Sequence, residues 1–137
     1  MPGRVFLDAN VLVYAQDGRA PDKQRRSREI IEQRAKNADG VISTQVMQEY
    51  FVAATRKLGV PPLAAKGVLK TFSAFDIVQV SPSLVHEAVD CSILNQMSFW
   101  DALILAAAAS AGCGTVLSED LNAGQSVLGV RVQNPFA

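Results

Sequence analysis

The sequence predicts an α/β fold in which helices cover both faces of a mainly parallel sheet of about five short strands. Short apolar runs alternate along the chain with longer segments of helical periodicity, and parallel strands need such crossovers between them. The 137 residues are 49% hydrophobic and 19% charged, a composition typical of a globular protein with a buried core. No linker, repeat or shift in composition divides the chain, so we expect residues 1–137 to form one domain.

Five short runs have the apolar composition of buried strands, and each is bounded by polar or turn-forming residues. In chain order, they cover residues 4–7, 40–42, 77–80, 115–117 and 130–132. The first run ends at Asp8, and the fourth is followed by Asp120. These two acids therefore lie at or just beyond the carboxyl ends of their strands.

Helices are predicted between the strands, each beginning at a residue that favours a helix start. In chain order, they cover residues 10–15, 22–38 with Asp22 as the cap, 44–58 after Ser43 or Thr44 and before Gly59, 62–72 after Pro61, 82–95 after Ser81, and 99–111 after Ser98. Residues 17–21 form a turn between the first two helices. The last helix is the most apolar segment of the chain, as expected of a helix buried in the middle of a domain.

Glu49 lies off the apolar stripe of its predicted helix. The stripe is formed by Val46, Met47, Tyr50, Phe51, Ala54 and Leu58. Glu49 instead shares a side with Gln45, Val52 and Arg56, and periodicity alone therefore leaves it in solvent.

Asp101 is the one polar residue between Phe99 and Ala109, and two interpretations fit it. It can complete a capping box with Ser98 at the positive end of the helix dipole. It can also belong to a functional site, because a buried carboxylate needs a hydrogen bond, a cation or a metal ion. The two roles are compatible, since a capped acid in the first helical turn is held at the rim of the core.

Three acids from distant parts of the chain are predicted to meet at one edge of the sheet. Asp8 and Asp120 follow parallel strands, and Asp101 begins the helix that leads into the strand before Asp120. Ligand sites in open parallel sheets form beyond the carboxyl ends of the strands. Clustered carboxylates repel one another, and a divalent cation would neutralise them. Oxygen ligands favour Mg²⁺ or Mn²⁺.

Composition argues against several other kinds of protein. The single histidine, His86, and the isolated Cys91 and Cys113 do not have the spacing of a zinc site, and we expect both cysteines to be buried. No apolar run approaches the ~20 residues of a membrane span and no signal pattern begins the chain, so we expect a cytoplasmic protein without membrane contact.

The net charge is zero, but the cations are unevenly distributed, since seven of the thirteen Lys and Arg residues lie between Arg19 and Lys36. This run, with Arg25 and Arg26 at its centre, could contact RNA phosphates. It could equally be a solvated helix face that Glu29 and Glu32 partly balance.

Four short motifs together resemble the PIN-domain ribonucleases, in particular the VapC-type toxins of VapBC toxin-antitoxin pairs. The motifs are Phe6-Leu-Asp8-Ala-Asn10, Gln48-Glu49-Tyr-Phe, Phe99-Trp-Asp101-Ala-Leu-Ile and Thr115-Val-Leu-Ser118-Glu-Asp120-Leu. They occur in the family's order, and the ending Gly129–Phe136 also resembles that of such proteins. The PIN fold agrees with the parallel sheet predicted above.

The resemblance implies a role for each matching residue. It makes Asp8, Glu49, Asp101 and Asp120 the catalytic acids, with Mg²⁺ or Mn²⁺ held by Asp8, Asp101 and Asp120. Asn10 and Ser118 would orient the carboxylates from a second shell. Some family members carry a further Asp at the place of Asn122, so the number of metal ions stays open.

The implied reaction is metal-assisted hydrolysis of an RNA phosphodiester by an activated water, which leaves a 5'-phosphate and a 3'-hydroxyl. The resemblance also implies a homodimer and a small cognate antitoxin that covers the site.

Two other interpretations of the sequence require residues that this chain lacks. A haloacid-dehalogenase-type phosphatase needs Asp-x-Asp and a late lysine, whereas this chain has Asn10 in the second position and no lysine after Lys70. A receiver domain fails for lack of the same late lysine and of an acidic pair before Asp8. A catalytically inactive PIN-like scaffold that binds RNA or a protein partner remains as the alternative, although it has no physical need for clustered carboxylates.

Overall fold

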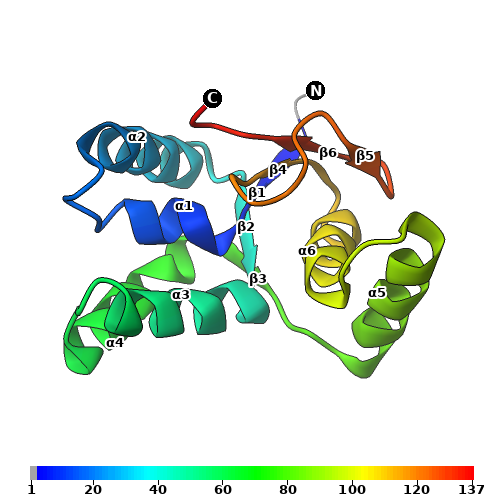
Figure 1. Ribbon diagram of the computed structural model, residues 1–137, viewed down its shortest axis with the longest axis horizontal. Helices are drawn as coiled ribbons and strands as arrows, with labels where there is room; N and C mark the ends of the chain where they lie inside the picture. Colours follow the sequence, from blue (N-terminus) through cyan, green and yellow to red (C-terminus); the bar gives the residue numbers. More distant parts are fainter. Residues whose placement is uncertain (1–2) are drawn as a thin grey trace.

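A computed structural model of the protein describes residues 3–137 and shows one six-stranded sheet between two groups of helices (Figure 1). The strands are β1 (Arg4–Leu7), β2 (Gly40–Ser43), β3 (Asp76–Val78), β4 (Cys113–Leu117), β5 (Ser126–Val127) and β6 (Val130–Gln133). They are arranged in the order β3-β2-β1-β4-β6-β5, and every pair is parallel except β5 with β6. The predicted α/β fold with a mainly parallel sheet is confirmed.

The helices lie on both faces of the sheet. They are α1 (Ala9–Tyr14), α2 (Pro21–Asn37), α3 (Thr44–Arg56), α4 (Pro62–Thr71), α5 (Pro82–Asn95) and α6 (Phe99–Ser110), with a 3-10 turn, η1, at Phe72–Ala74. Helices α1 to α4 cover one face, and α5 and α6 cover the other (Figure 1). This division follows from the strand order, because right-handed crossovers change face when the chain reverses direction across the sheet.

Helix α6 lies at the centre of the core, as its composition predicts. Residues 102–108 are all at most 3% exposed, because α6 packs against the sheet on one side and α5 on the other. Cys91 and Cys113 are buried free thiols, as predicted, whereas His86 is exposed on α5. Within residues 3–137, no single helix is long and apolar enough to cross a membrane; α5 and α6 meet the criteria only as a pair that is bent by 117°.

The sheet has a sixth strand that the sequence analysis did not predict. β5 has only two residues and pairs with β6 as an antiparallel hairpin. The connecting residues, Leu128 and Gly129, both have positive φ, as in a type I′ turn. A two-residue strand has no measurable periodicity, and a turn that begins with Leu lacks the usual Asn-Gly or Asp-Gly signal.

Several predicted helix and strand ends are shifted. Pro21, not Asp22, is the first residue of α2, and no side chain caps that helix; Asp22 instead pairs with Arg25. Ser43, Ser81 and Ser98 do cap α3, α5 and α6. The remaining differences are of one or two residues: α1 covers 9–14, α2 ends at 37, α3 at 56, α4 at 71 and α6 at 110. Strands β2 and β6 extend to 43 and 133, β3 covers 76–78, and β4 begins at 113.

Candidate functional site

The first and last parts of the site are joined by the pairing of β1 with β4. These strands are parallel, with Leu7 opposite Leu117, so Asp8 and Ser118 leave the sheet side by side. The Asp8 amide donates to the Leu117 carbonyl at 3.1 Å, which continues the ladder to the point where the chain turns into α1. Residues 110 positions apart thereby meet at one edge of the sheet.

Asp8 is the most buried of the four predicted acids, with 8% of its surface exposed. One carboxylate oxygen caps α1 by accepting from the Ala9 amide at 2.8 Å, and the other accepts from the Ser118 hydroxyl at 2.7 Å. Burial raises the pKa of Asp8, and the charges of Asp120 and Asp101 raise it further, although the hydrogen bonds from Ser118 and Ala9 oppose this shift. The site therefore favours a positive charge near Asp8.

Ser118 and Asn10 connect Asp8 to Asp120. The fully buried Ser118 hydroxyl oxygen accepts from the amides of Asp120 and Leu121, at 3.1 and 3.3 Å. Asn10 Nδ2 lies 3.4 Å from Asp8 Oδ2, 3.2 Å from Ser118 Oγ and 3.3 Å from Asp120 Oδ2. The Asn10 carbonyl oxygen accepts from the Glu119 amide at 3.2 Å. Both residues thus contact the carboxylates that the resemblance assigns them to orient.

Asp101 takes part in the capping of α6 through its backbone amide but not through its carboxylate. Its backbone amide donates to Ser98 Oγ at 3.1 Å, so Ser98 caps α6 as predicted. Within the described part of the chain, however, the Asp101 carboxylate makes no hydrogen bond back to Ser98 or to any other group. The carboxylate is therefore free to act in the cleft described next.

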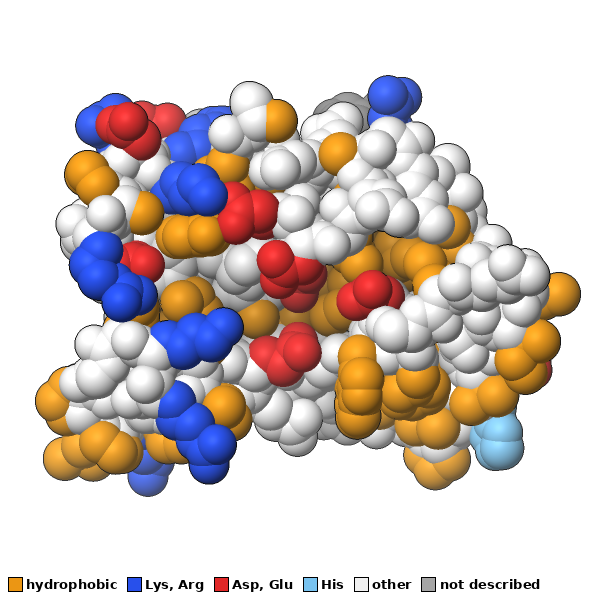
Figure 2. Space-filling model, viewed as in Figure 1, with side chains coloured by type: hydrophobic (Ala, Val, Ile, Leu, Met, Phe, Trp, Pro, Cys, Tyr) orange, Lys and Arg blue, Asp and Glu red, His pale blue; other side chains and the backbone are white. Residues whose placement is uncertain are grey.

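The four acids line one open cleft of about 700 Å³. Its walls come from α1, the end of β4, the start of α6 and one face of α3. Figure 2 shows the acidic side chains gathered near the centre of this face of the molecule, with Lys and Arg side chains on their left and hydrophobic side chains at lower right. Asp101 and Asp120 also line a smaller polar hollow of about 210 Å³, which Asn122 borders.

Glu49 faces the cleft and not bulk solvent alone, although its side chain is exposed. The face of α3 that lies off the apolar stripe is the face that lines the cleft, through Gln45, Glu49 and Val52. Partial burial raises the pKa of Glu49, and the charges of Asp8, Asp101 and Asp120 raise it further, against a hydrogen bond from Gln45. Helical periodicity does not reveal this, because a stripe shows which side is buried but not what borders the other side.

The cleft offers oxygen ligands of the kind that Mg²⁺ or Mn²⁺ prefers, since its described lining residues include four predicted acids but neither His nor Cys. As the side chains stand, no group of three or more Asp, Glu, His or Cys residues within residues 3–137 has the arrangement needed to hold a metal ion. The carboxylates of Asp8 and Asp120 instead share the Asn10 amide group. The donor set fits a hard cation, and the carboxylates would have to rearrange to bind it.

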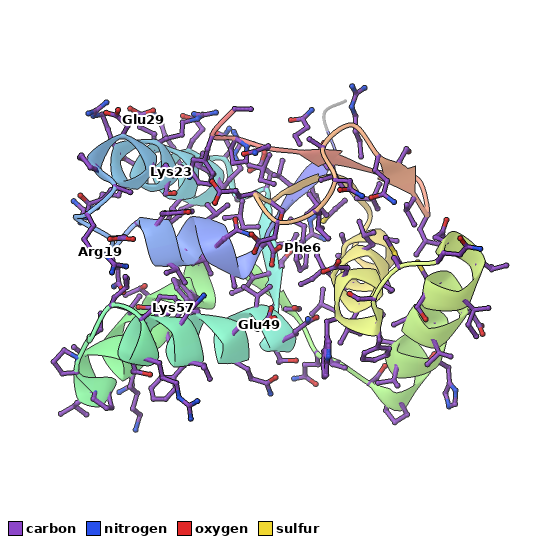
Figure 3. All side chains as sticks on the ribbon, viewed as in Figure 1. Phe6, Arg19, Lys23, Glu29, Glu49 and Lys57 are labelled. Carbon is purple, nitrogen blue, oxygen red and sulfur yellow. The ribbon has the colours of Figure 1, made fainter. Side chains whose placement is uncertain are left out.

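Three cations and an aromatic residue also line the cleft, and only one of them, Arg19, belongs to the basic run that was predicted to contact RNA. Arg19 comes from the α1–α2 connection, Arg56 and Lys57 from the end of α3, and Trp100 from α6. Figure 3 shows Lys57 on the same helix as Glu49, with Arg19 near the far end of α1. The spacing of Glu49, Arg56 and Lys57 at i, i+7 and i+8 on one helix was a usable signal.

Arg25 and Arg26, predicted to contact RNA, are not among the residues that line the cleft. Both lie on α2. Arg25 pairs with Asp22, and Arg26 lies 3.9 Å from Glu29 and donates to the carbonyl of Pro135. Their role in RNA binding stays a prediction.

Comparisons with known proteins identify the family of this fold. The PIN domain family model matches residues 5–125, which contain all four predicted acids. No curated protein is significantly similar in sequence.

Solved structures share the fold at low sequence identity. A toxin-antitoxin complex from Klebsiella pneumoniae has a chain that is 21% identical, with a TM-score of 0.71 over 96% of this chain and 97% of that one. A DNA-bound VapBC from Salmonella typhimurium is 18% identical, with a TM-score of 0.68 over 97% and 98%. The sarcin-ricin-loop-cleaving toxin VapC20 of Mycobacterium tuberculosis is also 18% identical, with a TM-score of 0.64 over 85% and 91%. The chain belongs to the PIN domain family.

Proposed function

We propose that this protein is a metal-dependent endoribonuclease and the toxin of a VapBC-type toxin-antitoxin pair. The observation that carries the proposal is the convergence of Asp8, Glu49, Asp101 and Asp120 on one cleft, with buried Asp8 fixed by Ser118. Membership of the PIN domain family and the fold shared with VapBC toxins support it. A site with carboxylates and no histidine suits hydrolysis of a phosphodiester better than acid-base cleavage by imidazole.

Asp8, Asp101 and Asp120 would hold the cation, and the donor set favours Mg²⁺ or Mn²⁺. The bound cation would acidify a water molecule and neutralise charge on the phosphate. The chain's own residues prepare the site for this chemistry. Ser118 and Ala9 hold the Asp8 carboxylate by two hydrogen bonds, and Asn10 keeps Asp120 beside it.

Glu49 enters the cleft from a different helix, where its raised pKa reflects burial and the three neighbouring charges. From that position it would orient the attacking water across from Asp8. A carboxylate whose pKa is raised is also a better proton acceptor than an exposed one.

Cleavage of a mixed panel of structured and unstructured RNAs tests this function. The purified protein should cut RNA in Mg²⁺ or Mn²⁺ but not in chelator, and Asp101→Asn should remove the activity because it removes one ligand charge. Asp90→Asn is the matched control, since Asp90 is exposed on α5 and outside the cleft. A folded Asp101→Asn protein with undiminished metal-dependent cleavage would overturn the assignment.

The partners follow from the same proposal. We expect a cognate antitoxin to cover the cleft, a homodimer as the assembly and the cytoplasm as the location. A face of α5 suits the homodimer, because Val85, Val89 and Ile93 follow one another at intervals of four residues and are 37%, 40% and 69% exposed.

A catalytically inactive PIN-like scaffold that binds RNA or a protein partner is the second candidate. One observation favours it, namely that the carboxylates as placed form no metal-binding group within the described residues. Calorimetric titration with Mn²⁺ separates the two functions. A nuclease should bind the ion through Asp8 and lose that binding in Asp8→Asn, whereas a scaffold need show no such heat.

A further inference from the structure

The cleft contains two features that hydrolysis itself does not need. The first is a cationic wall, which we define as Arg19, Arg56 and Lys57. The second is Trp100, which directly precedes Asp101. All four residues line the same cleft as the acids, and all four are exposed.

Arg56 and Lys57 are the unpaired part of the cationic wall. Arg19 forms an ion pair with Asp17 at 3.0 Å, which neutralises much of its charge. In residues 3–137, neither Arg56 nor Lys57 forms a salt bridge. Cations at a helix C-terminus also complement the helix dipole. Stabilising the helix dipole would not require Arg56 and Lys57 to line the same cleft as Glu49, so it does not explain where they lie.

The positions of Arg56 and Lys57 relative to Glu49 indicate how a nucleic-acid strand would run along the cleft. Glu49 and Arg56 are seven residues apart on α3, which corresponds to about 10 Å along the helix axis. Figure 3 shows Glu49 and Lys57 at separate places on this helix, with Lys57 toward Arg19. A nucleic-acid strand with one phosphate at the acids would therefore place a neighbouring phosphate near Arg56 and Lys57.

Trp100 lies at the acidic end of the cleft and is unusually open for an indole. It is 63% exposed, packs edge to face on Phe99 with ring centroids 5.1 Å apart, and has its carbonyl held by Gln45 Nε2 at 3.2 Å. A fixed, exposed aromatic ring beside a phosphate-cleaving site is a platform on which an unpaired base can stack.

We propose that the cleft binds single-stranded RNA between these two features. Arg56 and Lys57 bind the phosphate backbone on one side of the acids, and Trp100 stacks a base on the other. This inference deepens the proposed nuclease function and rests on it. It explains how a polyanion enters an acidic cleft, because the cations offset the repulsion of the carboxylates. It also selects single strands, since a base in a duplex is already stacked and cannot reach the indole.

The contribution of the wall is tested by the salt dependence of RNA binding. The background is Asp8→Asn in chelator, which prevents cleavage, and the probe is a short RNA oligonucleotide without self-complementarity. Arg56→Gln with Lys57→Gln should weaken binding and reduce the slope of log K against log salt by about 1.4, the value for two lost single-strand phosphate contacts.

The matched control is Arg25→Gln with Arg26→Gln, which removes the same charge from α2, outside the cleft. It should change the slope by less than the Arg56 and Lys57 substitutions do, even though Arg25 and Arg26 are themselves predicted to contact RNA. A larger effect from the α2 pair, or equal effects from both pairs, would overturn the cationic wall as the backbone site. Circular dichroism of each variant verifies that it is folded.

Trp100 provides its own signal, because it is the only tryptophan in the chain. The single-stranded RNA should quench its fluorescence, and the same RNA annealed to its complement should quench it less. Trp100→Leu should lower the affinity by about 5- to 150-fold, the range expected for one base stacked on an aromatic ring. Trp100→Phe should recover part of that loss, because a ring remains.

If RNA does not quench the fluorescence, or if Trp100→Leu binds RNA as tightly as the parent, the stacking role is overturned. Contact with a protein partner would then be the better explanation of the exposed Trp100. Cleavage assays separate this failure from failure of the proposed function. A parent that cleaves RNA in Mn²⁺ but shows neither effect retains the nuclease function without this binding mode. A parent that shows both effects but never cleaves retains the binding mode and contradicts the nuclease.

Discussion

At the scale of single residues, the Ser118 hydroxyl holds the two ends of the chain's acidic site together. It donates to Asp8, accepts from the amides of Asp120 and Leu121, and lies 3.2 Å from the Asn10 amide nitrogen. The side chain is completely buried, so water cannot replace any of these contacts. Loss of a buried hydroxyl leaves its partners unsatisfied, which costs more than the hydrogen bond itself contributes.

We therefore expect Ser118→Ala to reduce the free energy of unfolding by about 1–3 kcal/mol, measured by urea denaturation. It should also reduce cleavage by loosening Asp8 and Asp120. Ser110→Ala is the control, because Ser110 is exposed and bonds only to the Ala107 carbonyl in its own helix. That change should stay within about 0.5 kcal/mol. Equal effects of the two substitutions would contradict a special role for Ser118.

Asp8 should make the metal-free protein less stable as the pH rises. Its pKa is raised in the folded state, chiefly by burial, so the folded protein binds the proton more tightly than the unfolded chain. The stabilisation from that proton is present below the unfolded pKa and is lost as the pH rises through the folded pKa. In chelator, the stability of Asp8→Asn relative to the parent should therefore increase as the pH rises above about 4, the pKa of an unperturbed Asp, as measured by thermal melts. A difference that shrinks as the pH rises would contradict the prediction.

The Asp101→Asn variant tests whether the Asp101 carboxylate stabilises α6 as a helix cap or only lines the cleft. The carboxylate accepts no hydrogen bond within residues 3–137, and Asn retains the backbone amide that Ser98 caps. The variant should melt no lower than the parent in chelator, since it also removes a like charge. A loss of about 1 kcal/mol would instead indicate that the carboxylate stabilises α6 as a cap.

At the scale of helices and strands, close packing of the chain against itself decides where small residues are needed. A Cβ atom added to Gly40 in β2 would lie 2.6 Å from Phe75 Cδ1 and 3.0 Å from Arg34 Cβ. A Cβ added to Gly67 in α4 would meet nothing within 4 Å. Two glycines in one protein are thus predicted to respond oppositely to the same substitution.

Gly40→Ala should destabilise the protein by about 1–3 kcal/mol, because the Phe75 ring must move out of the core. Gly67→Ala should stabilise it by about 0.5–1 kcal/mol, since alanine has the higher helix propensity. Denaturant unfolding of both variants measures these changes. Destabilisation by Gly67→Ala, or a neutral Gly40→Ala, would contradict the packing shown here.

The same scale shows which elements can be predicted from the sequence. The parallel strands, the serine caps and the buried α6 were predicted, because periodicity and capping are local properties. The β5–β6 hairpin was not, since two residues and a Leu-Gly turn carry no clear signal. Asp8 and Asp120 were placed at one edge from topology alone. Glu49 was included only by resemblance. Helical spacing relates Arg56 and Lys57 to Glu49, but their place in one cleft with Arg19 and Trp100 depends on the packing of α1, α3 and α6.

At the scale of the whole molecule, residues 3–137 include several exposed apolar side chains. Val85, Val89 and Ile93 form one face of α5, whereas Leu63, which is 80% exposed, lies on a different helix, α4. Isolated exposed apolar residues are common on protein surfaces, whereas a continuous helical stripe indicates an interface. The stripe on α5 is therefore the better candidate for contact with a second copy.

Ile93→Glu should convert the proposed homodimer to a monomer, because it places a charge in the middle of an apolar contact. Leu63→Glu should leave the dimer intact. Sedimentation velocity at several protein concentrations measures both outcomes. A dimer that survives Ile93→Glu, or one that Leu63→Glu dissociates, would place the interface elsewhere.

The pairing of β1 with β4 has a further consequence for the order in which the protein is made. The ribosome adds Asp8 110 residues before its hydrogen-bond partner Ser118. Synthesis passes through α1 to α6 before the two central strands can pair and bring Asp8 beside Asp120. A nascent chain that stops before Ser118 therefore contains at most three of the four acids and lacks the hydroxyl that links Asp8 to the Asp120 amide. The four acids can therefore line one cleft only after Ser118 and Asp120 have been synthesised.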